Sequence, residues 1–94
     1  MKQIPKSVKI GGLRYRVRIL PKAELNEQAR DRVFGMADHE QLVIALCNDA
    51  TIESQWRTLF HEIAHILGGL QDEREAEVRS GLWHQVVVDM GLLS

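Results

Sequence analysis

The first half of the chain alternates between apolar and polar positions. From residue 8 to residue 19 every second position is apolar, apart from a break at Gly11 and Gly12, and the positions between them carry lysine or arginine. A period of two with a Gly-Gly break predicts a β-hairpin with one buried and one solvent-facing side. Two further apolar segments, residues 33–36 and 42–46, flank a polar turn and predict a second pair of strands. We therefore expect three or four antiparallel strands.

The segment between these two predicted hairpins, residues 21–32, gives a weaker signal. It begins with Pro21, which suits the first turn of a helix, but it has few apolar residues that could anchor a helix to a core. We interpret this segment as a mobile connection.

The apolar period changes to that of a helix after Asn48. A helix is predicted from the N-cap residue Thr51 to the two glycines at 68–69, because apolar residues recur on one stripe. A second helix is predicted over residues 72–91, and we expect its tryptophan, like that of the first helix, to lie in the core. The predicted fold is α+β: a small antiparallel sheet with two helices packed on one face, forming a single domain over residues 1–94.

The first predicted helix contains the pattern HExxH at residues 61–65. Because His61 and His65 are four residues apart, they lie on one side of the helix and can both bind one tetrahedral Zn²⁺ ion. Glu62 projects about a quarter turn away, where it can take a proton from water at the metal and pass it to a leaving amine. The two histidines also lie nearly opposite the apolar stripe of the helix. We therefore predict a zinc site at a cleft, with Glu62 as the general base.

A hydrolytic zinc site needs a third protein ligand and an open position. The start of the second predicted helix offers four carboxylates, those of Asp72, Glu73, Glu75 and Glu77. The helical phase of Glu75 matches that of three apolar residues, Val78, Leu82 and Val86. A carboxylate on a packed helix face is costly unless a metal or a cation compensates it. We therefore prefer Glu75 as the third ligand, with Glu73 second and Glu77 third.

This combination of HExxH and a glutamate on the next helix resembles the gluzincin metallopeptidases. The resemblance is to the single-domain minigluzincins and the ImmA/IrrE-like peptidases of phages and mobile elements. Segments outside the motif are also similar to small phage-encoded members: VKIGGLRYRV at 8–17, LVIAL at 42–46, TLF at 58–60 and GL at 81–82. The similarity covers nearly the whole chain, but only the motif is highly specific.

The resemblance implies that His61, His65 and Glu75 bind zinc and that Glu62 is the general base. It also implies that the strand nearest the motif holds an extended peptide by edge pairing. Larger gluzincins place a polar partner for a zinc histidine four residues beyond the glutamate, and here that position is Arg79, which cannot accept a hydrogen bond. The candidates for a transition-state donor are His84, His39 and Tyr15, each of which is more typical of a surface or sheet residue.

The composition excludes several classes of protein. Ninety-four residues support one modest core, and 12 Lys+Arg against 13 Asp+Glu leave a formal net charge of −1. This balance argues against partners such as nucleic acid or an anionic membrane surface. No apolar run approaches the roughly 18–20 residues of a membrane span. Cys47 has no partner for a disulfide, so we expect a cytoplasmic protein in which this cysteine is buried.

These observations predict a zinc-dependent endopeptidase that hydrolyses a peptide or protein substrate and binds neither nucleic acid nor membrane. The alternative is a zinc-binding regulatory or interaction module of phage or mobile-element origin, with little turnover and a protein partner. The alternative is motivated by Arg79 at the bracing position and by the small surface that 94 residues leave for substrate pockets.

Overall fold

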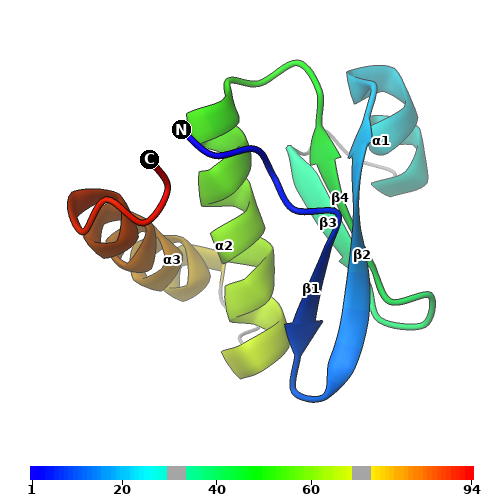
Figure 1. The fold of residues 1–94 in the computed structure, drawn as a ribbon. Coiled ribbons are helices and arrows are strands. Elements are labelled where there is room, and N and C mark those ends of the chain that lie inside the picture. Colours follow the sequence, from blue (N-terminus) through cyan, green and yellow to red (C-terminus); the bar gives the residue numbers. More distant parts are fainter. Residues whose placement is uncertain (30–33, 69–72) are drawn as a thin grey trace.

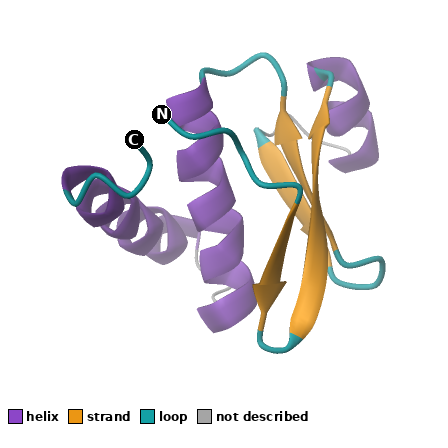
Figure 2. Cartoon of the chain, viewed as in Figure 1, coloured by secondary structure: helices purple, strands orange, loops and turns teal. Residues whose placement is uncertain are grey.

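A computed structural model describes residues 1–29, 34–68 and 73–94 of the chain. Within these residues the fold is α+β, as predicted, with a four-stranded sheet and three helices (Figures 1 and 2). The strands are β1 (Ser7–Ile10), β2 (Leu13–Leu20), β3 (Gly35–Asp38) and β4 (Val43–Cys47), and the helices are α1 (Lys22–Ala29), α2 (Ile52–Gly68) and α3 (Glu73–Asp89). Among the described residues, no helix combines the length and the apolar character needed to cross a membrane.

Both predicted hairpins are confirmed. Strands β1 and β2 pair antiparallel, and the two residues that join them, Gly11 and Gly12, have φ values of 58° and 86°. A two-residue turn with both φ values positive matches the twist of the strands and favours glycine. Strands β3 and β4 also pair antiparallel, and in their turn an oxygen of Asp38 accepts hydrogen bonds from two backbone N–H groups.

The sheet as a whole is mixed, so the prediction of a purely antiparallel sheet is wrong. The strand order is β1-β2-β4-β3, and β2 runs parallel to β4. Parallel neighbours need a crossover connection. The crossover contains α1, so residues 22–29 of the predicted mobile connection are helical, while residues 30–32 lie outside the described part of the chain.

Helices cover both faces of the sheet and not one face, as the sequence had predicted (Figure 1). Helix α2 packs on one face, over a core made by Ile10, Tyr15, Ile44, Leu46 and Leu59. Helix α1 packs on the other face, over a second cluster made by Leu20, Leu25, Ala45 and Cys47. Strand β4 contributes alternate residues to the two clusters, which explains its uninterrupted apolar run. Cys47 is 1% exposed, so its predicted burial is confirmed.

Helix α3 packs against α2 and not on the sheet. The expected core position of Trp83 is wrong, because this side chain is 42% exposed. Trp56 of α2 is partly buried against the core, and its indole N–H donates a hydrogen bond to the backbone carbonyl of Lys2 at 2.8 Å. The second predicted helix therefore exists with nearly the expected bounds, but a different face of it is packed.

Candidate metal centre

Helix α2 presents its two motif histidines beside the core and not within it. The helix begins after Thr51, whose hydroxyl oxygen accepts a hydrogen bond from the backbone N–H of Ser54 at 3.1 Å, so the predicted N-cap is confirmed. Leu59 is buried against the sheet, whereas His61 and His65 are partly exposed on the side of α2 that faces the start of α3. The amphipathic period of this segment thus places both imidazoles at a boundary between two helices.

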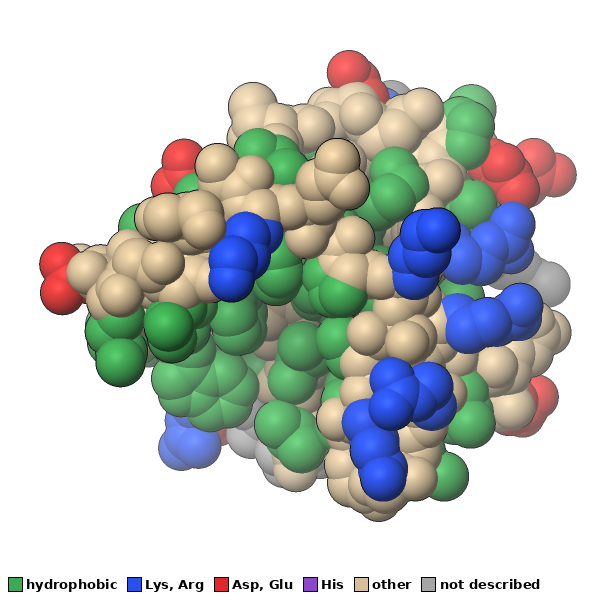
Figure 3. All heavy atoms as spheres, in the orientation of Figure 1, with side chains coloured by type: hydrophobic (Ala, Val, Ile, Leu, Met, Phe, Trp, Pro, Cys, Tyr) green, Lys and Arg blue, Asp and Glu red, His purple; other side chains and the backbone are tan. Residues whose placement is uncertain are grey.

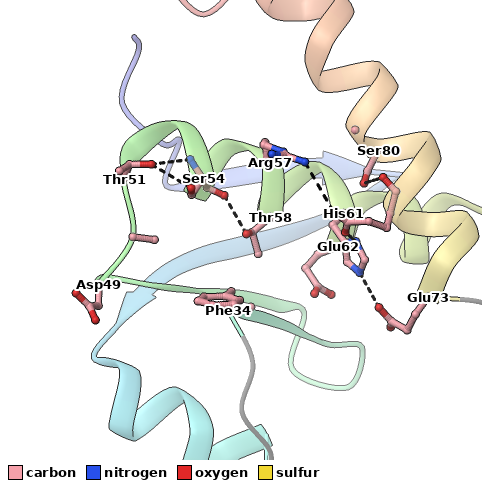
Figure 4. Close-up of a pocket in the computed structure, with 14 residues that line it drawn as sticks. Phe34, Asp49, Thr51, Ser54, Arg57, Thr58, His61, Glu62, Glu73 and Ser80 are labelled. Carbon is pink, nitrogen blue, oxygen red and sulfur yellow. Dashed lines mark hydrogen bonds and ion pairs between the residues drawn. The ribbon is translucent and has the colours of Figure 1, made fainter.

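Three potential ligand groups meet at this boundary. The Nε2 atoms of His61 and His65 lie 3.1 Å apart, and the two carboxylate oxygens of Glu73 each lie 3.0 Å from one of them. Figure 4 shows the contact between His61 and Glu73. In a tetrahedral zinc site with bonds of about 2.0–2.1 Å, neighbouring donor atoms are about 3.3 Å apart. The observed distances of 3.0–3.1 Å between neighbouring donor atoms are close to that value, although the two distances to Glu73 involve its two different oxygens. The residues present therefore fit a zinc ion held by two imidazoles and one carboxylate.

Glu75, the ligand preferred from the sequence, lies outside this cluster. Its carboxylate pairs with Arg79, one turn further along α3, at 2.7 Å. The premise for choosing Glu75 is also wrong, because the apolar residues that share its phase are exposed: Val78, Leu82 and Val86. The structure brings the second-ranked candidate, Glu73, to the histidines, and Asp72 lies outside the described residues.

Glu77 lies on the outer side of His61. One of its carboxylate oxygens is 2.9 Å from His61 Nδ1, which is an ion-pair distance, although the ring N–H is not aligned for a hydrogen bond. A carboxylate at this position favours a proton on Nδ1 and leaves the Nε2 lone pair free for a metal. The position four residues beyond the ligand glutamate, where a bracing partner is expected, is Arg79 if Glu75 is the ligand. If Glu73 is the ligand, that position is Glu77.

Glu62 lies beside the cluster and is only 9% exposed. Its side chain points into the cleft next to His61 (Figure 4). Burial raises the pKa of Glu62 above its ordinary value, and the imidazoles of His61 and His65 oppose that increase. The predicted base is therefore a largely desolvated carboxyl group within the electrostatic field of the two proposed ligands.

The cleft has a volume of about 860 Å³ and lies between α2, α3 and the beginning of β3. Its wall includes Phe34 and Gly35, which the sequence predicted as strand residues but not as part of a site. A Cβ atom on Gly35 would lie 2.5 Å from the Cγ2 atom of Thr58, so only glycine lets β3 approach α2 this closely. This close approach was not recognisable from the motif, but a lone glycine within an apolar strand segment is a signal for it.

None of the three predicted transition-state donors lines this cleft. Tyr15 is buried, and its hydroxyl oxygen lies 3.4 Å from the Nδ1 atom of His39. His84 is buried on the packed side of α3 against Phe60, with a ring-centroid distance of 6.0 Å. The cationic side chain that does line the cleft is Arg57, which the sequence reasoning missed, although it stands one helical turn before His61.

No protein-family model, curated protein or solved structure matches the chain. The resemblance to the gluzincins therefore stays a prediction, carried by the HExxH motif and the downstream glutamate. The geometry of the cluster is an observation on this chain alone and does not depend on that resemblance.

Proposed function

We propose that the chain is a zinc-dependent metallopeptidase of the gluzincin type, in which His61, His65 and Glu73 bind the metal and Glu62 is the general base. The observation that carries the proposal is the convergence of three ligand groups beside a buried carboxyl group at the wall of a cleft. Zinc hydrolases characteristically combine three protein ligands with an open position. The two histidines and one carboxylate of this cluster supply such a set.

In the proposed mechanism Glu62 transfers the proton and Glu77 orients a zinc ligand. Zinc, when bound, would polarise the scissile carbonyl and make a nearby water molecule more acidic. Glu62 accepts the proton that this water loses as its oxygen attacks the carbonyl carbon, and then donates it to the leaving amine nitrogen. Burial raises the pKa of Glu62, which makes its carboxylate a stronger proton acceptor for the first of these two steps. Glu77 holds the ring of His61 with Nε2 directed at the metal position.

An extended peptide is the substrate that the cleft fits best. Strand β3 is at the edge of the described sheet, and the residues at its start line the cleft. An exposed edge can pair with a peptide backbone, while side-chain specificity comes from neighbouring apolar groups. Phe34 is 64% exposed at this wall and offers such a contact. We therefore propose that β3 binds the substrate backbone. We further propose that the protein is cytoplasmic and acts on peptides or proteins.

The test is cleavage of a peptide library by zinc-loaded protein, with Glu62→Gln as the matched variant. Both proteins should hold one equivalent of zinc, and the variant should cleave at least about 100-fold more slowly because the proton acceptor is lost. Equal cleavage rates would remove Glu62 from the mechanism. Peptide binding by both proteins without cleavage by either would favour the alternative, a zinc-binding interaction module.

The metal assignment has its own control. Purified wild-type protein should contain zinc, and His61→Ala should lose most of it because one of three ligands is gone. A wild-type zinc content below half an equivalent, unchanged by His61→Ala, would contradict the proposed site.

A further inference from the structure

Helix α3 carries its larger apolar side chains on the side that faces away from α2. The buried residues of the helix are small or polar, namely Ala76, Ser80 and His84. Five larger apolar side chains, four on α3 and one directly after it, are between 42% and 65% exposed: Val78, Leu82, Trp83, Val86 and Met90, which we call the α3 stripe. Large apolar side chains gathered on the exposed side of a helix are typical of a surface that packs against another protein.

The α3 stripe lies away from the metal centre. Helix α3 contributes four residues to the wall of the cleft, and none of them belongs to the stripe: Glu73, Glu77, Ser80 and Gly81. Figure 3 shows hydrophobic side chains gathered along α3, and none of the chain's four histidines is visible on that face. A partner seated on the stripe would therefore leave the cleft open.

We propose that the α3 stripe is the interface through which two copies of the chain form a two-fold symmetric dimer, with α3 packed against α3. From their exposed fractions, the five side chains present roughly 500–600 Å² of surface, at the upper end for the largest apolar patch of a monomer. A standard interface buries about 800 Å² per partner, so flanking residues need to supply only about a third of the area.

The charges around the α3 stripe suit a second copy of the same surface. Glu75 and Arg79, which lie on the same side of α3 at the start of the stripe, pair with each other at 2.7 Å, and the whole chain has a formal net charge of −1. Two copies can therefore approach without strong like-charge repulsion. A symmetric interface also requires a surface that is compatible with itself, and an apolar stripe that carries the paired Glu75 and Arg79 at its start meets that requirement.

The proposal is tested by light scattering coupled to size-exclusion chromatography over a range of protein concentrations. Wild-type protein should have twice the mass of one chain, and Leu82→Glu should halve that mass, because it places a charge in the centre of the stripe. The matched control is Leu13→Glu, the same substitution at a leucine that is 52% exposed at the β1–β2 hairpin, and it should remain dimeric.

The outcomes are distinct from those of the metal proposal. A monomeric wild-type protein, a dimeric Leu82→Glu variant, or equal dissociation of Leu13→Glu would each overturn the α3 dimer. Circular dichroism checks that the variants are folded, and Val86→Glu replaces Leu82→Glu if the latter is not. Zinc content is measured on the same samples and should be the same in monomer and dimer, so failure of the dimer leaves the metal centre untouched.

Discussion

Glu77→Gln isolates the role assigned to the carboxylate behind His61. The substitution keeps the size of the side chain and removes the charge that lies 2.9 Å from Nδ1. Loss of a carboxylate that orients a metal-binding histidine typically weakens metal affinity by about 10–100-fold. Glu77 is 61% exposed and its contact with the ring is not an aligned hydrogen bond, so water already screens part of the interaction. We therefore expect the lower end of that range, about tenfold or about 1.4 kcal/mol.

The assay is competition for zinc between the protein and a chelator of known affinity. The matched control is Glu75→Gln, which removes the same charge two residues earlier on α3, where the carboxylate pairs with Arg79. Its zinc affinity should stay within about twofold of wild type, because surface ion pairs contribute little. If Glu75→Gln weakens zinc binding as much as Glu77→Gln, or if Glu77→Gln has no effect, the assignment of Glu77 is refuted.

Three further predictions concern stability. Gly35→Ala should lower the free energy of unfolding, measured in urea, by about 1–3 kcal/mol. Adding Thr58→Ser, which removes the methyl group that the new Cβ atom would meet, should restore most of the lost stability. No recovery in the double variant would contradict the close contact. Burial and the charge of Arg57 hold the pKa of His84 below its ordinary value, so the folded chain binds this proton less readily than the unfolded chain. The free energy of unfolding should therefore fall as the pH decreases below about 6.5, and His84 should contribute at most about 1.4 kcal/mol per pH unit to this slope. His84→Leu should reduce that slope, and an identical slope would refute the assignment. Thr51→Ala should lower the free energy of unfolding by about 1 kcal/mol through loss of the N-cap, and an unchanged urea midpoint would contradict this.

Much of the fold follows from local periodicity. The alternation before residue 20, the glycine pair at the first turn and the N-cap at Thr51 each specify a local structure, and each is observed. The parallel pairing of β2 with β4 could not be read in the same way, because it depends on how a crossover packs and not on local pattern. The unbroken apolar run of β4 was an available signal for burial on both faces.

The candidate site was predictable as far as the motif reaches. HExxH identified three residues that the structure places close together on α2, and two of them, His61 and Glu62, line the cleft. The choice of Glu75 failed to match the geometry because we assumed that the largest apolar side chains of α3 mark its packed face, whereas that face is made of small and polar residues. The better signal was the spacing of four between Glu73 and Glu77, which lets both carboxylates reach the same histidine from one side of a helix.

The most direct test of the central claim is a crystal structure of the zinc-loaded protein, with anomalous scattering measured at the zinc edge. We expect one strong anomalous peak within about 2.0–2.2 Å of His61 Nε2, His65 Nε2 and an oxygen of Glu73. A peak whose carboxylate ligand is Glu75, or a zinc ion bound away from both histidines, would contradict the account.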